Sequence, residues 1–264
     1  MGKHFIMEKF DKKEGLNAQK RSIIGSLLSE ISWEGSKVTR YRNGGQGLEN
    51  VLTSEVFQIL YFLPRTHFLG EIVKNLHTKN ALAIDKLVNE IEQSEFDLFP
   101  GNYYLIEEPL SHQKGMAVQP DSLLISDSVY TLIEVKRIRR SSFQKEQLAR
   151  EFYLVCREAK NKMPLLLLII PKEPPVSIAG GGKKNIVEHI KETLKKVYLQ
   201  ADSSVLSLEE LTSLVENHVA WITWEEIYNL VKKQVLNYDS NNHSEKNSVE
   251  RLCNALLEAI ERHS

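Results

Sequence analysis

The chain has 264 residues, of which 42% are hydrophobic and 26% are charged, a composition typical of a globular protein. Its formal net charge is -1, which excludes an overall attraction to polyanions, so any nucleic-acid contact has to come from a local cationic patch. The two cysteines, Cys156 and Cys253, are too few for a disulfide framework or a cysteine-based metal site.

No segment of the sequence is typical of a secretory signal or a membrane span. The N-terminal segment lacks the apolar run that a signal peptide needs. The most apolar run, Leu165 to Ile170, is far shorter than the stretch of about 20 residues that crosses a bilayer as a helix. We therefore expect a soluble cytoplasmic protein without a membrane partner.

The first third of the chain is predicted to be mostly helical. Residues 16–31 and 47–62 carry apolar residues at the spacing of an amphipathic helix. A further helix is expected to begin at Pro64 and run over 64–77, and Asn80 can cap another over 81–93.

Strands are predicted in the middle of the chain. Residues 102–107, 122–126 and 129–138 are short runs rich in β-branched or aromatic residues, and the last two are close enough to form a hairpin. Helical periodicity returns over 142–161. The apolar run at 165–170 then predicts a strand that is buried on both faces.

The C-terminal part alternates between helices and strands. Residues 172–185 are so rich in proline and glycine that no regular structure is expected there. A helix over 186–199, a strand over 218–222, a helix through Lys233 and, after a polar linker, an amphipathic helix over 249–263 complete the chain. This order predicts an α/β fold, in which a mixed β-sheet is flanked by helices on both faces.

One group of residues on the predicted hairpin is a candidate functional site. Pro120 and Asp121 open its first strand, and Glu134, Val135 and Lys136 lie late in its second. Because side chains alternate along a strand, Glu134 and Lys136 should project from one face, which would then be polar, and Val135 from the other. Antiparallel pairing should place Asp121 opposite the Glu134 region, within reach of a shared cation.

Two carboxylates and an ammonium in this arrangement suit a hard divalent cation such as Mg²⁺ or Mn²⁺. Such an ion can bind a phosphodiester oxygen, lower the pKa of a bound water and neutralise charge on the scissile phosphate. Lys136 would stabilise that charge or, if neighbouring cations depress its pKa, help to deprotonate the water; we favour the electrostatic role. These residues therefore indicate hydrolysis of a phosphodiester.

The pattern resembles the PD-(D/E)XK, or restriction-endonuclease-like, superfamily of nucleases. Pro120, Asp121, Glu134 and Lys136 match the motif of that superfamily position by position, and both halves fall on predicted strands. The resemblance implies that Asp121 and Glu134 are metal ligands, that the carbonyl of Val135 is a third, and that Lys136 is the catalytic lysine.

Members of this superfamily often add two further residues to the site. One is a glutamine on the helix after the lysine strand, for which the sequence offers Gln144 and Gln147; Gln147 is preferred because it lies one turn further into the helix. The other is an acid from an N-terminal helix, for which Glu49 ranks before Glu55.

The resemblance also implies a domain organisation and a role. We expect a single nuclease domain over 1–264, in which a restriction-endonuclease-like core (46–236) follows an N-terminal helical extension (1–45) and precedes a linker and C-terminal helix (237–264). The implied activity is cleavage of DNA, more often than of RNA, in restriction, repair or antiviral defence. A homodimer or a helicase or ATPase partner is implied as well, since the chain has no motor motif of its own.

Cationic residues gather beside the candidate site. From Lys136 to Arg150 there are six cations and one acid, which would suit a groove that follows a nucleic-acid backbone, although a solvated strand end looks the same in sequence. The segment 179–185 could cradle a phosphate before its helix, or be a simple connection. The candidate nucleic-acid-binding residues are Arg137, Arg139, Arg140, Lys145, Arg150, Lys183 and Lys184.

Two other interpretations of the motif stay open. Asp121 could cap a turn while Glu134 and Lys136 form a solvated cross-strand ion pair, in which case no metal would bind. The chain could also be a catalytically inactive nucleic-acid-binding or assembly subunit that keeps the fold. The presence of all three motif residues favours the enzyme.

Overall fold

The structure is a computed structural model that describes residues 46–106, 116–139, 141–201 and 206–264. The helix predicted over 16–31, the extension over 1–45 and Arg140 therefore lie outside the described residues.

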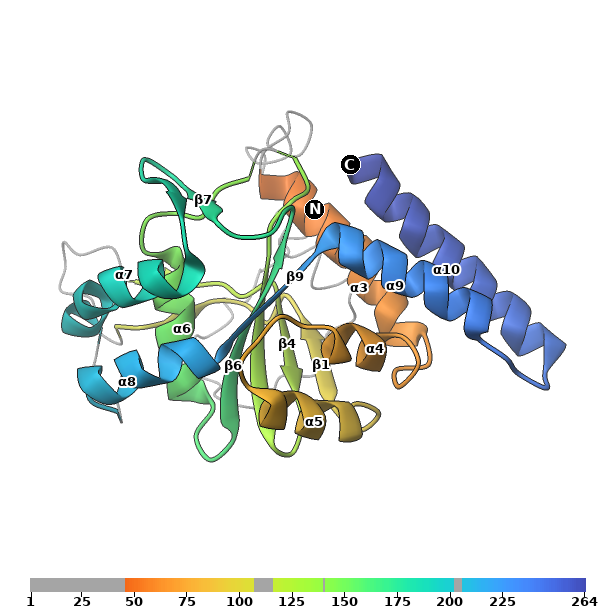
Figure 1. Cartoon of the computed structure of the whole chain (residues 1–264), viewed down its shortest axis with the longest axis horizontal. Coiled ribbons are helices and arrows are strands. Elements are labelled where there is room, and N and C mark those ends of the chain that lie inside the picture. Colours follow the sequence, from red (N-terminus) through yellow and green to blue (C-terminus); the bar gives the residue numbers. More distant parts are fainter. Residues whose placement is uncertain (1–45, 107–115, 140, 202–205) are drawn as a thin grey trace, which may run out of the picture.

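A mixed five-stranded sheet forms the centre of the molecule (Figure 1), in the order β1-β4-β5-β6-β9. Antiparallel pairs join β1 (Glu95–Leu98) to β4 (Ser122–Ile125) and β4 to β5 (Val129–Val135). Two parallel pairs then add β6 (Met163–Ile170) and β9 (Val219–Thr223). The predicted hairpin, the buried strand and the mixed sheet are thus confirmed.

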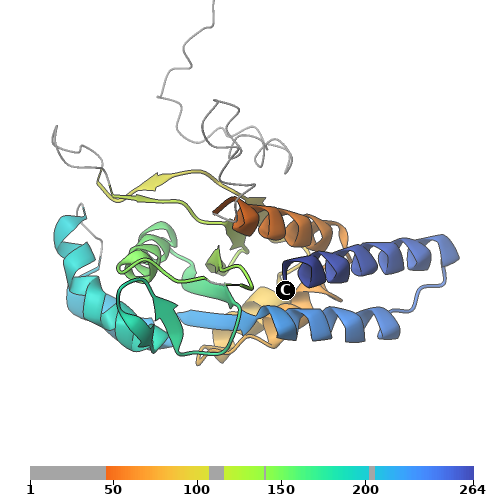
Figure 2. The same ribbon diagram turned by 90° about the horizontal axis from the view of Figure 1, so that it is seen from above.

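One face of the sheet packs against the helices at the two ends of the described chain. Seen from above (Figure 2), α3 and α10 run side by side, and α10 also packs on α9. Asn80 caps α5 as predicted, with its side chain accepting a hydrogen bond from the Ala83 amide at 3.0 Å. These helices are α3 (Gln46–Phe62), α4 (Leu69–Lys74), α5 (Ala81–Asn89), α9 (Trp224–Asn237) and α10 (His243–His263).

The other face is covered by α6 (Gln147–Glu158) and α7 (Ile186–Gln200), with α8 (Leu208–Leu214) and a 3-10 turn, η1 (Val215–Asn217), beside α7. Helices therefore lie on both faces, as predicted. Strand β6 is buried on both, because its leucines and isoleucines point alternately into the two cores.

The sheet alternation also determines which side chains meet α6. Along β5, Ile133 and Val135 enter the core under α3 and α9, whereas Leu132 enters the core under α6. Glu134, between Ile133 and Val135, shares the α6 face. That face was expected to be polar, but α6 covers it, and Glu134 is only 3% exposed.

Several element boundaries differ from the prediction. The helix expected from Pro64 begins only at Leu69, after turns in which the His67 and Phe68 amides donate to the Pro64 carbonyl. The helix expected over 142–161 is confined to α6. The C-terminal helix starts earlier than predicted, because Asn242 caps it.

The strand expected over 102–107 is reduced to β2 (Tyr103–Tyr104), which pairs with β3 (Ala117–Val118) outside the main sheet. The edge strand of the main sheet beside β4 is β1, a four-residue strand that was not predicted. In β1 buried and exposed residues alternate, which is the pattern of an edge strand packed on one face.

The proline- and glycine-rich segment 172–185, expected to lack regular structure, contains a hairpin of β7 (Val176–Ile178) and β8 (Gly182–Lys184). Glycine makes the turn possible, since Gly180 and Gly182 both adopt a φ of 71°. The hairpin is also tied to the segment before α6: the Phe143 amide donates to the Ser177 carbonyl at 2.9 Å, and the Ala179 amide to the Phe143 carbonyl at 2.8 Å.

In the part of the chain that the structure describes, no helix combines the length and the apolar character that a membrane crossing requires.

Candidate functional site

The candidate site lies where β4 begins and β5 ends. Ser122 pairs with Ile133 in the antiparallel register, so the preceding Asp121 comes beside the following Glu134. The Asp121 carboxylate accepts a hydrogen bond from the Val135 amide at 2.7 Å, which fixes its orientation. The predicted meeting of Asp121 and Glu134 is therefore confirmed.

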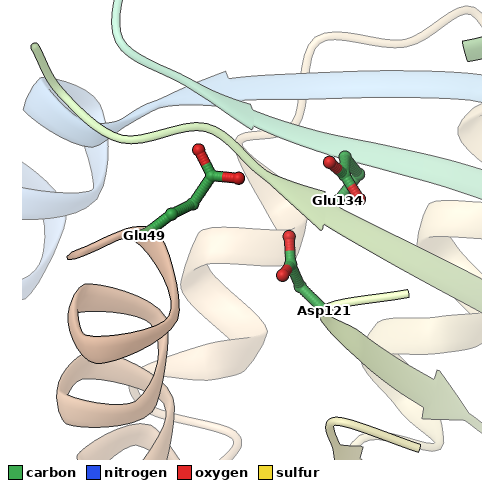
Figure 3. Close-up of side chains that lie close together, drawn as sticks. All are labelled: Glu49, Asp121 and Glu134. Atoms are coloured by element: carbon green, nitrogen blue, oxygen red, sulfur yellow. The ribbon is translucent and has the colours of Figure 1, made fainter. Parts of the chain in front are cut away.

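A third carboxylate arrives from α3, whose first turn carries Glu49. Figure 3 shows the side chains of Glu49, Asp121 and Glu134 pointing toward a common space from a helix and two neighbouring strands. One oxygen atom from each lies within 4.8 Å of the others. A hard cation binds oxygen ligands grouped in this way, so the cluster could hold a metal ion.

The structure also separates the two glutamates that the sequence left as alternatives. Glu55, on the same helix, forms an ion pair with Arg262 at 3.2 Å and lies 3.4 Å from His263 Nε2. It therefore links α3 to the end of α10, and only Glu49 is in the cluster.

Lys136 is enclosed by this cluster. Its Nζ donates to Glu134 Oε1 at 2.5 Å and to Glu49 Oε1 at 3.1 Å, and lies 5.2 Å from the centre of the Phe143 ring. The backbone is held as well: the Lys136 amide donates to the Ile169 carbonyl at 2.8 Å, and Trp224 Nε1 donates to the Lys136 carbonyl at 2.7 Å. The ammonium has little room to move.

The surroundings of Lys136 keep it protonated. Burial alone would lower its pKa, but the carboxylates of Glu134, Glu49 and Asp121 raise the pKa above its ordinary value. Among the described residues, the charges that act on Lys136 are carboxylates and not the neighbouring cations on which its second predicted role depends. Both roles of Lys136 stay predictions.

The positive charge of Lys136 does not offset the burial of the carboxyl groups of Asp121 and Glu134. Burial raises the pKa of Asp121 well above its ordinary value, and the negative charge of Glu134 raises it further. Burial likewise raises the pKa of Glu134, although Lys136 opposes the effect. Carboxylates crowded in this way favour a bound cation, whose charge would offset their mutual repulsion.

Of the two candidate glutamines, only Gln147 reaches the centre. It is the first residue of α6, and its Nε2 donates to Glu134 Oε1 at 2.5 Å. Gln144 is exposed, and its side chain accepts a hydrogen bond from Arg150 at 3.1 Å.

Sequence reasoning missed Glu151, which lies one helical turn after Gln147. It is 2% exposed and is hydrogen-bonded to Glu134 and Gln147. Burial raises its pKa well above the ordinary value. The signal was an acid among the apolar positions of α6, beside Leu148 and Phe152, where a solvated glutamate would be out of place.

The cationic residues fall into two groups. The Arg139, Lys145 and Lys183 side chains are exposed, whereas Arg137, Arg150 and Lys184 are half-buried. Arg150 donates to Gln144, and Lys184 pairs with Glu192 at 3.2 Å.

The first amides of α7, which follow the segment 179–185, donate to a side chain of the protein itself. The Asn185 side chain accepts hydrogen bonds from the Val187 and Glu188 amides at 3.0 and 3.3 Å. These are the amides that a phosphate at this helix end would use.

In comparisons with known proteins, no protein-family model matches the chain, and neither a curated protein nor a solved structure does. The chemistry of the chain therefore has to be inferred from the site itself.

Proposed function

We propose that the protein is a metal-dependent nuclease that hydrolyses phosphodiester bonds of DNA, and that its sheet and flanking helices are a restriction-endonuclease-like core. The observation that carries the proposal is the convergence of Glu49, Asp121 and Glu134 around Lys136.

This convergence is unlike a chance surface ion pair. Glu49 and Lys136 are 87 residues apart in the chain, yet they hydrogen-bond. Glu134 and Lys136 are 3% and 6% exposed, which argues against the solvated cross-strand pair considered from the sequence. Removing such charges from water costs several kcal/mol per ion, so a cluster of this kind is more readily explained by function than by stability.

The donor set fits Mg²⁺ or Mn²⁺, which bind carboxylate and carbonyl oxygens. Asp121, Glu134 and the Val135 carbonyl would be ligands, and Glu49 completes the acidic cluster. When bound, the ion would supply Lewis-acid chemistry toward a phosphodiester and its attacking water. Zinc is less favoured, because the cluster contains neither histidine nor cysteine.

The protein side chains have separate tasks in this proposal. Lys136, held as an ammonium, stabilises the negative charge that develops on the scissile phosphate. Gln147 orients Glu134 through its hydrogen bond. The exposed Arg139, Lys145 and Lys183 contact phosphates farther along the substrate.

The biological setting follows from the resemblance of the motif. DNA is preferred to RNA as substrate, and restriction or antiviral defence in the cytoplasm is the role we propose. Such a nuclease would act as a homodimer or beside a helicase or ATPase that supplies translocation.

Cleavage assays test the proposal directly. Supercoiled plasmid, linear duplex DNA, single-stranded DNA and RNA are incubated with the protein in Mg²⁺, Mn²⁺ or EDTA. Glu49→Gln and Lys136→Met are compared with Glu55→Gln, which alters an acid of the same helix outside the cluster.

Cleavage that requires metal, disappears in Glu49→Gln and Lys136→Met and persists in Glu55→Gln would support the nuclease. Cleavage in EDTA, or cleavage that survives both site variants, would contradict it. Metal-dependent cleavage of RNA alone would support the proposed hydrolysis of phosphodiesters and contradict DNA as the substrate.

A further inference from the structure

An open pocket of about 730 Å³ lies beside β9, at the edge of the main sheet opposite β1. Its walls come from β9, from the segment 76–79 before α5 and from the first turns of α7. The volume is in the range of sites that hold small organic ligands. None of the acids of the cluster lines it, nor does Lys136, so the pocket needs an explanation of its own.

A pair of stacked rings forms one wall of this pocket. His77 lies on Trp221 with ring centroids 3.9 Å apart and an angle of 10° between the ring planes. The two backbones are joined as well, because the His77 amide donates to the Trp221 carbonyl at 2.9 Å and the Trp221 amide to the His77 carbonyl at 3.1 Å. His77 Nε2 also lies 2.6 Å from Glu226 Oε1. The rings are thus held in place, while the His77 side chain remains 43% exposed.

The charged residues of the lining balance one another. They are two lysines and two glutamates, Lys79, Lys191, Glu188 and Glu216. Glu216 pairs with Lys79 and lies 3.9 Å from Lys191. This balance favours a ligand without net charge over a phosphate, and the same side chains supply both hydrogen-bond donors and acceptors.

A nucleobase has the properties that this lining selects. It is planar and uncharged, and its edges carry both donors and acceptors. Unpaired bases stack on aromatic side chains, including histidine. Ile186 and Val219, which are buried, add apolar surface beside the ring pair.

The ring pair lies in line with the candidate site. Glu134 pairs with Leu168 and Leu168 with Trp221, so the three residues form one row across β5, β6 and β9. Leu168 belongs to the core under α6, and Trp221 packs against the same core, so the row is on the face that carries Glu134. Because neighbouring strands are about 4.8 Å apart, the backbones of Glu134 and Trp221 are roughly 10 Å apart.

The β7–β8 hairpin connects the two places. The Phe143 amide donates to the Ser177 carbonyl of β7, and the Phe143 ring centre is 5.2 Å from Lys136 Nζ. Pro174 and Asn185, which flank the hairpin in sequence, line the pocket. A nucleic-acid strand that crosses the site could therefore follow the hairpin to the pocket, over a distance of about three stacked nucleotides.

We propose that this pocket binds an unpaired nucleobase, stacked on His77 and Trp221. The base belongs to the substrate strand, a few nucleotides from the scissile phosphodiester, and this assignment rests on the proposed nuclease function. A base inside a duplex is stacked and paired and does not enter such a pocket. The substrate is therefore a single strand or a duplex from which a base is extruded. A free nucleoside has the same chemistry, so the test separates the two sources.

Binding to the full chain in EDTA tests the pocket without cleavage. Fluorescence anisotropy compares a labelled single-stranded oligonucleotide with an abasic strand of the same length, which keeps the phosphates and lacks the bases. Saturation-transfer difference NMR detects free adenosine, guanosine, cytidine and thymidine. Wild type is compared with His77→Ala and with His67→Ala, a control histidine that contacts the Tyr238 ring at 5.1 Å and does not line the pocket.

His77→Ala should weaken binding of the normal strand about tenfold, the scale of one base stacked on an aromatic side chain. Binding of the abasic strand should not change, and His67→Ala should behave as wild type. A loss confined to free nucleosides would support the nucleobase and contradict the substrate strand as its source. Equal losses on the normal and abasic strands, or no loss on any ligand, would overturn the pocket.

Photo-cross-linking in wild type keeps the proposal testable if His77→Ala fails to fold. A single strand that contains 5-iodouracil is irradiated on the protein, and mass spectrometry locates the modified residues. We expect cross-links to His77 or Trp221, and cross-links found only outside the pocket would overturn the proposal.

The outcome is separable from that of the cleavage assays, because binding in EDTA needs neither metal nor hydrolysis. Base binding at His77 in a protein that cleaves no nucleic acid would leave the pocket and overturn the nuclease. Metal-dependent cleavage without base binding at His77 would leave the nuclease and overturn the pocket.

Discussion

Two glutamates that lie near opposite ends of strand β5 have contrasting environments. Near its start, the Glu90 carboxylate accepts hydrogen bonds from Ser126 Oγ at 2.5 Å and from the amide and Oγ of Ser128 at 2.8 and 2.6 Å. Near its end, Glu134 has the Lys136 ammonium on one oxygen and further carboxyl groups around it.

These environments shift the two pKa values in opposite directions. Hydrogen bonds from Ser126 and Ser128 hold the pKa of Glu90 below its ordinary value. Burial raises the pKa of Glu134 despite Lys136. Glu90, which ties the β4–β5 turn to the end of α5, is thus surrounded by donors, whereas the site acids are surrounded largely by one another. The contrast separates an acid that stabilises the fold from acids that could hold a cation.

The largest expected effect concerns catalysis. Glu134→Gln should lower the rate of DNA cleavage by about a thousandfold, the scale on which one electrostatic group of an active site acts, while Glu90→Gln should leave the rate unchanged. Initial rates at fixed Mn²⁺ on the substrate that wild type cleaves measure both. Equal losses in the two variants would show that the contrast between the two ends of β5 is not functional.

The next effect concerns stability as a function of pH and metal. The folded-state pKa values of Asp121, Glu134 and Glu151 are raised. The stability that these groups contribute in their protonated form is therefore fully present below the ordinary carboxyl pKa. It is lost as the pH rises through their raised folded-state pKa values. In EDTA, the melting temperature should fall as the pH rises from about 5 to about 8.

Mn²⁺ should reverse that loss, because it binds the ionised carboxylates of the folded state. Saturating Mn²⁺ should raise the melting temperature by several degrees near pH 8 and by less near pH 5. Differential scanning calorimetry at both pH values checks this. Glu90, with its lowered pKa, has the opposite dependence: its contribution is present above the ordinary carboxyl pKa and is lost as pH falls. A metal effect of equal size at both pH values would argue against ion binding by the site acids.

A smaller effect is expected from removing the structural glutamate. Glu90→Gln should destabilise the fold by about 1 kcal/mol, because glutamine replaces one of the two carboxylate oxygens that accept hydrogen bonds from the turn. Urea unfolding in EDTA measures the change. Glu134→Gln should be neutral or stabilising under the same conditions, since it relieves repulsion among the site acids. The reverse order of stabilities would contradict the assignment of the two roles.

The part of the site that the sequence predicted best is the part built from local pairing. Asp121 and Glu134 lie on one hairpin with a short turn, so alternation and register were enough to bring them together. The sequence analysis ranked Glu49 before Glu55, but the physical basis of that order is the packing of α3 against both the site and α10, which periodicity does not contain.

The elements that the sequence did not predict depend on contacts distant in the chain. The β7–β8 hairpin looked like a loop because proline and glycine mark it, yet it is held by backbone hydrogen bonds to Phe143. Glu151 was overlooked because an acid on an amphipathic helix is ordinarily solvated, and only the packing of α6 on the sheet reveals its burial.

The smallest expected effect concerns two neighbouring lysines on the β7–β8 hairpin. Like Glu90 and Glu134, they have different surroundings, so their expected effects differ. Lys184 pairs with Glu192, whereas the Lys183 side chain is exposed. Lys183→Ala should weaken DNA binding a few-fold and reduce the slope of log affinity against log salt by about one, as expected for one phosphate contact. Lys184→Ala should change the slope less, because its charge is already partly neutralised. Fluorescence anisotropy in Ca²⁺, across a series of salt concentrations, measures the DNA affinity of both variants. A larger change in slope from Lys184→Ala than from Lys183→Ala would mean that the hairpin presents its other face to the substrate.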